Sequence, residues 1–88
     1  MSATRINLSV DDERLKKIND LMKRTGAKSK GELFTYALTL YDWVTREVEE
    51  GRELVSYEKD SRRMKELEMP SFRTAREQAR RRAEEADA

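Results

Sequence analysis

The 88-residue sequence has no cysteine and no histidine, and it has only one proline and three glycines. Without cysteine the chain can form neither disulfide bonds nor thiolate metal sites. Without histidine it lacks the residue that most often binds zinc or acts as a general base. It also contains no internal repeat and no glycine-rich phosphate-binding loop. These absences predict a protein that is not an enzyme and that uses no cofactor or metal.

Long apolar runs are missing too, so the sequence shows neither a signal peptide nor a segment that could span a bilayer. Hydrophobic residues make up 36% of the chain and charged residues 42%. A chain of this length and composition can bury only a modest core by itself, and self-association is the usual remedy. We therefore expect a cytoplasmic protein of prokaryotic type that forms oligomers.

Residues 4–10 alternate between apolar and polar side chains, which is the pattern of a half-buried strand. The alternating residues are Ile6, Leu8 and Val10 on the apolar face and Arg5, Asn7 and Ser9 on the polar face. One strand is not stable alone, and the residues that follow have helical patterns. The strand is therefore predicted to pair with the same strand of a second copy, forming an antiparallel ribbon with a polar, basic outer face.

Two helices are predicted after this strand. Asp11 is a good N-cap for the first helix, which ends at a break before Gly26. Ser29, with Glu32 three residues later, forms the sequence signature of a capping box, and the second helix runs from there to about Glu50. Its wide apolar face predicts the main dimer interface. The residues predicted for the dimer core are Ile6, Leu8, Val10, Phe34, Leu38 and Tyr41.

The net charge of +1 conceals an uneven distribution. Residues 1–30 have eight basic and four acidic side chains, whereas residues 31–50 have one basic and five acidic side chains. The basic excess therefore accompanies the predicted ribbon, as expected of a surface that faces nucleic acid.

The order of strand, short helix, glycine-containing turn and longer apolar helix resembles the ribbon-helix-helix (Arc/MetJ/CopG-type) DNA-binding superfamily. The resemblance covers residues 4–48 and implies a homodimeric DNA-binding domain over residues 1–50. It is carried by the alternating strand and by the turn at residues 26–31. In that family the outward strand residues contact bases and the start of the second helix contacts a phosphate. The resemblance thus assigns base contacts to Arg5, Asn7 and Ser9, and phosphate contacts to Lys28, Ser29, Lys30 and Gly31.

The chemistry of these residues is consistent with that assignment. Arg5 can form a bidentate pair with guanine and Asn7 with adenine, each worth about 1–3 kcal/mol of discrimination, and Ser9 is a more permissive contact. The first N–H groups of a helix and its dipole form an anion site, to which two lysines add positive charge.

Residues 51–88 form a C-terminal extension to this domain. β-prone segments predict a small hairpin within residues 52–69, and a loosely ordered linker is the alternative. A charged helix is predicted over residues 71–86, capped by Ser71, with a thin apolar stripe that begins at Phe72. The alternative is a solvated tail. The predicted fold is therefore mainly α, with one N-terminal β-strand.

Three functions are compatible with this pattern. The first is a transcriptional repressor that binds double-stranded DNA as a homodimer and assembles further on neighbouring sites. The second is an antitoxin whose residues 51–88 bind a partner protein. The third is a structural dimer whose ribbon does not touch DNA.

Overall fold

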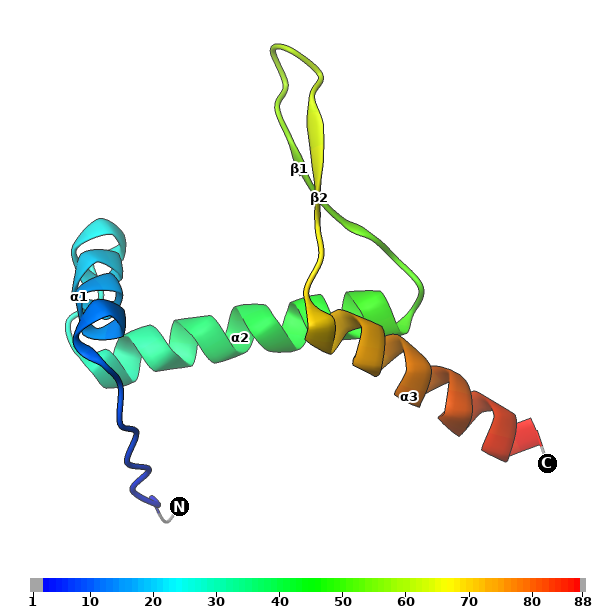
Figure 1. Ribbon diagram of the computed structural model, residues 1–88, viewed down its shortest axis with the longest axis horizontal. Helices are drawn as coiled ribbons and strands as arrows, with labels where there is room; N and C mark the ends of the chain where they lie inside the picture. The colour runs from blue at the N-terminus through cyan, green and yellow to red at the C-terminus, as the bar shows by residue number, and fades with distance from the viewer. Residues whose placement is uncertain (1–2, 88) are drawn as a thin grey trace. The chain divides into compact units, whose positions relative to one another are not determined.

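The computed structural model describes residues 3–87 and is mainly helical, with one small antiparallel sheet (Figure 1). Its elements, in chain order, are α1 (Asp12–Thr25), α2 (Lys30–Glu49), β1 (Leu54–Tyr57), β2 (Met64–Leu67) and α3 (Pro70–Asp87). The chain divides into two compact units, the first ending at Ala37 and the second beginning at Leu38. Each unit is described by itself.

Helix α1 has the boundaries that its capping residues predict. The Asp11 carboxylate accepts a hydrogen bond from the Arg14 N–H at 2.8 Å. At the other end Gly26 adopts the left-handed conformation, with φ of 75°, and donates its N–H to the Met22 carbonyl. Both caps satisfy main-chain groups that the helix itself leaves without partners.

The start of α2 is also capped as predicted, because the Ser29 Oγ accepts a hydrogen bond from the Glu32 N–H at 3.0 Å. The Glu32 carboxylate is held one turn further along, where Oε1 accepts a hydrogen bond from the Tyr36 hydroxyl at 2.6 Å. The second half of the predicted capping box, a hydrogen bond from the Ser29 N–H to this carboxylate, is therefore not formed among the described residues.

Helix α2 ends in a Schellman motif around Gly51, which has a φ of 86°. Gly51 donates its N–H to the Val48 carbonyl at 3.1 Å, and Arg52 donates to the Glu47 carbonyl at 3.0 Å. The Arg52 side chain bonds to the carboxylates of Glu50 and Glu47, which raise the pKa of its guanidinium. The predicted end of the second helix is confirmed.

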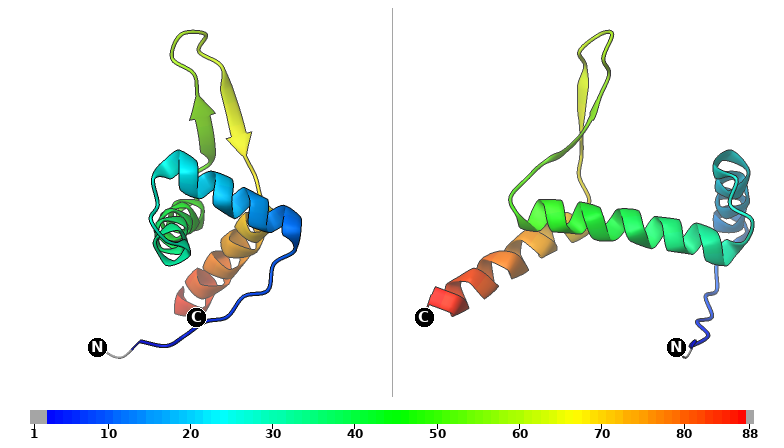
Figure 2. Two further views of the ribbon diagram at one scale, coloured as in Figure 1. Left: turned by 90° about the vertical axis from the view of Figure 1, so that its left-hand side faces the viewer. Right: turned by 180° about the vertical axis from the view of Figure 1, so that it is seen from behind.

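The predicted hairpin is present, and the alternative of a loosely ordered linker is wrong. Strands β1 and β2 pair antiparallel, with Leu54 opposite Leu67 and Tyr57 opposite Met64, as the two neighbouring arrows in Figure 2 show. The Glu58 N–H closes the hairpin by donating to the Arg63 carbonyl at 2.9 Å. Arg62 takes a positive φ of 57° within this turn.

The core of the second unit joins α2 to α3. Phe72, only 1% exposed, packs with Val44 and Val48, and Leu54 and Ala75 pack against this cluster. The predicted charged helix is present. The alternative of a solvated tail is wrong for the start of this helix, because the buried ring of Phe72 anchors it. From residue 80 to residue 87 the helix is exposed, as expected of a solvated tail.

Helix α3 begins at Pro70, one residue before its predicted start. Proline suits the first turn of a helix because its missing N–H would have no partner there. Ser71, predicted as the N-cap, instead lies inside the first turn. Its hydroxyl accepts a hydrogen bond from the Tyr41 hydroxyl at 2.6 Å.

The predicted N-terminal strand is not formed within a single chain, since residues 3–11 have no regular secondary structure. A strand needs a hydrogen-bonded neighbour, and β1 and β2 pair with each other. Over the described residues, none of the helices combines the length and the apolar character needed to cross a membrane.

Candidate nucleic-acid interface

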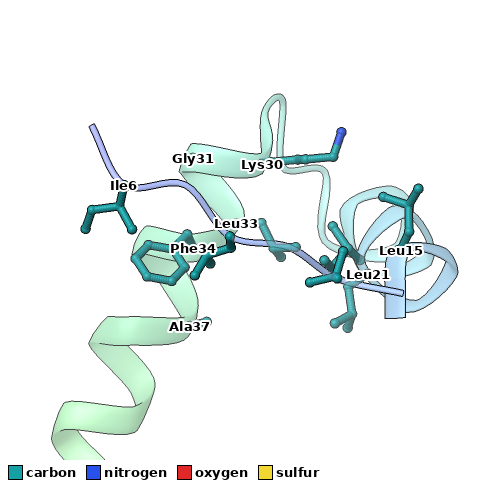
Figure 3. A pocket seen from close by; sticks show the side chains of 11 residues that line it. Ile6, Leu15, Leu21, Lys30, Gly31, Leu33, Phe34 and Ala37 are labelled. Carbon is teal, nitrogen blue, oxygen red and sulfur yellow. The ribbon is translucent and has the colours of Figure 1, made fainter. Parts of the chain in front are cut away.

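An open apolar groove lies in the first unit, between the N-terminal segment, α1 and the start of α2 (Figure 3). Its volume is about 650 Å³. Its lining residues are Ile6, Leu8, Val10, Leu15, Ile18, Leu21, Lys30, Gly31, Leu33, Phe34 and Ala37. The groove therefore brings together all three residues of the predicted apolar strand face. The described residues include no buried polar side chain that could orient a small ligand there.

Most apolar side chains of this groove are left exposed by residues 3–87. Ile6 and Leu8 are each 69% exposed, and Phe34 is 43% exposed. Contiguous exposed apolar surface of this kind usually marks a site of protein association. The residues predicted for the dimer core are thus accessible to a second copy.

The polar side chains of the same segment are exposed as well. Arg5, Asn7 and Ser9 alternate in sequence with the residues that line the groove. Over residues 3–87, none of the three takes part in a hydrogen bond or an ion pair. Their donors and acceptors are therefore available to an external partner.

The turn before α2 carries the residues predicted to contact phosphate. Ala27, only 8% exposed, anchors this turn, whereas Lys28 and Lys30 are exposed and no ion pair within the described chain involves them. The Ser29 Oγ is already used in capping, so its main chain and not its side chain is the group available to an anion. The first N–H groups of α2, including that of Gly31, have no partner within the helix.

Gly31 is not required by the packing of the chain. A Cβ at this position would meet only the Ser29 Oγ, at 3.8 Å, which is an ordinary contact. An approach of another molecule to the main chain here is one reason why glycine would be favoured over alanine, since glycine costs stability inside a helix.

The start of α2 also carries one acidic side chain, Glu32, which is hydrogen-bonded to Tyr36. The hydrogen bond to the Glu32 carboxylate, together with its negative charge, raises the pKa of the Tyr36 phenol above its ordinary value of 10.0. Both side chains were absent from the predicted site, although their spacing of four residues along a helix is a signal for such a contact.

The α2 residues predicted for the dimer core lie at helical spacing and are partly exposed. Phe34 belongs to the first unit, while Leu38 and Tyr41 begin the second and are 52% and 44% exposed. The hydroxyl of Tyr41 is bonded to Ser71, a contact that spans 30 residues and that no sequence pattern signals. Its ring remains available for association.

Comparison of the chain with protein-family models, with curated proteins and with solved structures finds no match.

Proposed function

We propose that the protein is a homodimeric, sequence-specific DNA-binding protein of the ribbon-helix-helix type that acts as a transcriptional repressor. One observation carries this proposal: Ile6, Leu8 and Val10 line an uncovered apolar groove, while the residues between them are polar, exposed and without partners. Such a segment has an apolar side suited to a dimer core and a polar side suited to contact with DNA.

The dimer follows from the need to pair and cover this segment. Residues 3–11 have no ladder partner in a single chain, and exposed main-chain groups in an extended segment pair readily with a second strand. The same segment of a second copy, related by a two-fold axis, would supply that strand and bring its own apolar side chains over the groove. Both copies would then place their polar residues on the outer face of one ribbon.

Base recognition is assigned to that outer face. A two-stranded ribbon fits the major groove of DNA. Arg5 and Asn7 have the planar, bidentate groups that distinguish guanine and adenine, and Ser9 adds a less selective contact. With two copies of each side chain, the preferred DNA site would have two related half-sites.

Phosphate contacts are assigned to the turn before α2. The N–H groups of residues 29–31 and the positive end of the helix dipole would hold a phosphate, with Lys28 and Lys30 supplying counter-charge. These contacts position the dimer without reading sequence. The Glu32 carboxylate lies nearby in sequence, and its hydrogen bond with Tyr36 favours a position away from such a phosphate.

Substitutions separate the two kinds of contact. Asn7→Ala should weaken binding to a preferred site by about 1–3 kcal/mol and relax base preference at one position in each half-site. Lys30→Ala should instead weaken binding to all DNA sequences alike. It should also lower the slope of log affinity against log salt concentration by about one for each subunit that contacts a phosphate. The control is Lys17→Ala, at an exposed position of α1. It should change neither the DNA affinity nor its salt dependence. Equal affinity of the Asn7→Ala and unmodified proteins for the preferred site would contradict the proposal.

A second candidate function is that of an antitoxin, in which residues 51–88 bind a partner protein together with the part of α2 that belongs to the same unit. The observation that favours it is the exposure of Leu40 and Trp43, at 62% and 55%, on α2. Large aromatic residues at such positions are common anchors of protein interfaces. Co-purification of one additional protein at a stoichiometric ratio, lost on Trp43→Glu but retained on Asn7→Ala, would support this function.

A further inference from the structure

Each strand of the hairpin has one edge that no other described element covers. In the described chain β1 pairs only with β2, so the opposite side of β1 is an open sheet edge. A hairpin with strands of four residues is marginally stable when it stands alone, and open edges tend to recruit a further strand.

The register shows which main-chain groups this edge presents. Glu58 donates its N–H to the Arg63 carbonyl, so these two residues form a hydrogen-bonded pair. Hydrogen-bonded and non-hydrogen-bonded pairs alternate along an antiparallel ladder. In this register Ser56 bonds to β2, whereas the N–H and C=O groups of Val55 and Tyr57 point away from β2.

The side chains of β1 do not protect this edge. Strand residues 54–57 have the sequence Leu-Val-Ser-Tyr, without a charge or a proline. Natural sheets usually discourage edge pairing by placing charged residues or proline on the edge strand. Strand β2 has two such charged residues, Lys65 and Glu66. Val55 and Tyr57 are 51% and 55% exposed, so the apolar surface beside the edge is open as well.

We propose that the open edge of β1 pairs antiparallel with β1 of a second copy of this chain, forming the four-stranded sheet β2-β1-β1-β2 across two molecules. The two-fold axis passes between the two copies of Ser56. Val55 then lies opposite Tyr57 of the second copy, and the outward main-chain groups of both residues become hydrogen-bonded.

Charge complementarity selects this register. In this register Glu53, the residue before β1, faces Lys59 of the second copy, which is the first residue of the hairpin turn, and the symmetry repeats this pair at the other end. Pairing through β2 is less favourable, because its central registers place Lys65 opposite Lys65 or Glu66 opposite Glu66. Neither Glu53 nor Lys59 forms an ion pair within the described chain, so both are available for the contact.

This contact does not involve the N-terminal segment and does not depend on DNA binding. If the protein forms the dimer proposed above, pairing through β1 joins dimers to one another and provides a route to cooperative assembly. If that dimer is absent, the same contact still joins two chains.

The first test is disulfide cross-linking of purified full-length Ser56→Cys. In a non-hydrogen-bonded antiparallel pair the Cα atoms are about 4.5 Å apart, which lies within the range for a disulfide. The chain has no other cysteine, so any covalent dimer reports this one position. Mild oxidation should convert most of Ser56→Cys to a covalent dimer, at least tenfold faster than Glu66→Cys, the control on the outer edge of β2.

The second test is charge reversal, measured as the self-association constant by analytical ultracentrifugation. Glu53→Lys and Lys59→Glu should each weaken association through β1 about tenfold, because each creates two like-charged pairs. The double variant should restore the original association. Equal cross-linking of Ser56→Cys and Glu66→Cys, or a double variant no better than the single ones, would overturn the proposal. The proposed function is tested separately by DNA binding of Asn7→Ala.

Discussion

The hydroxyl of Tyr41 donates a hydrogen bond to the hydroxyl of Ser71 at 2.6 Å, joining α2 to the first turn of α3. Both residues lie in the second unit, next to the cluster of Val44, Val48 and Phe72. The C-terminal extension is therefore attached to α2 by a polar contact as well as by an apolar core.

Loss of this hydrogen bond should have a small but measurable effect. Tyr41→Phe should lower the free energy of unfolding by about 0.5–1.5 kcal/mol, toward the lower figure because both side chains are partly exposed. Urea denaturation of Tyr41→Phe, Ser71→Ala and the double variant provides the measurement. The effects of the two single substitutions should not add, since they remove the same bond. Full additivity would contradict the contact.

Phe72 should contribute far more to stability than any other residue of α3. Phe72→Ala removes an almost fully buried ring from the contact with Val44 and Val48, at a cost of about 3–5 kcal/mol. In a chain of this size that loss should unfold much of the second unit, visible as a large fall in helical circular dichroism. The matched control is Gln78→Ala, an exposed position of the same helix, which should change stability by about 0.5 kcal/mol or less. Similar effects of the two substitutions would show that α3 does not pack on α2.

The caps of α1 give two further substitutions with defined costs. Asp11→Ala removes the side chain that accepts the Arg14 N–H and should destabilise the protein by about 1 kcal/mol. Gly26→Ala forces a Cβ into a left-handed conformation and should cost about 1–2 kcal/mol, although no neighbouring atom would clash with it. Thermal denaturation measures both. An increase in stability on Gly26→Ala would show that the turn does not have a positive φ.

Tyr36 should ionise at a higher pH than an ordinary phenol. Its hydrogen bond to Glu32 raises the pKa of the Tyr36 phenol in the folded protein above 10.0. The bond therefore contributes its full stabilisation below pH 10.0. As the pH rises through 10.0, Tyr36 in the unfolded chain releases its phenol proton first. The stabilisation by the hydrogen bond is lost as the pH passes the pKa of this phenol in the folded protein. Absorbance titration of tyrosinate in the unmodified protein and in Tyr36→Phe measures this. The substitution should remove a component that titrates above pH 10.0, and removal of a component that titrates at or below pH 10.0 would contradict the assignment.

Features set by local chemistry could be predicted from the sequence. Asp11, Gly26, Ser29 and Gly51 act through main-chain groups a few residues away, so their positions alone predict the ends of α1 and α2. The hairpin follows in the same way from two short β-prone segments on either side of a polar turn.

Contacts between distant residues were not predictable. Nothing in the sequence shows that Phe72 reaches Val48 or that Tyr41 reaches Ser71, because periodicity describes a face and not its partner. The alternating pattern of residues 4–10 is clear, but the described chain offers no neighbouring strand, so the N-terminal strand stays a prediction. The assignment of Arg5, Asn7 and Ser9 to DNA remains a prediction for the same reason.

The most direct test of the central claim is selection of bound sequences from a random double-stranded DNA pool, with the full-length protein and with Asn7→Ala in parallel. The account predicts that the unmodified protein enriches short repeated half-sites and that Asn7→Ala loses the preference at one position of each half-site. Lack of enrichment by the folded, unmodified protein would contradict the account. The N-terminal segment and the groove would then serve dimerisation alone.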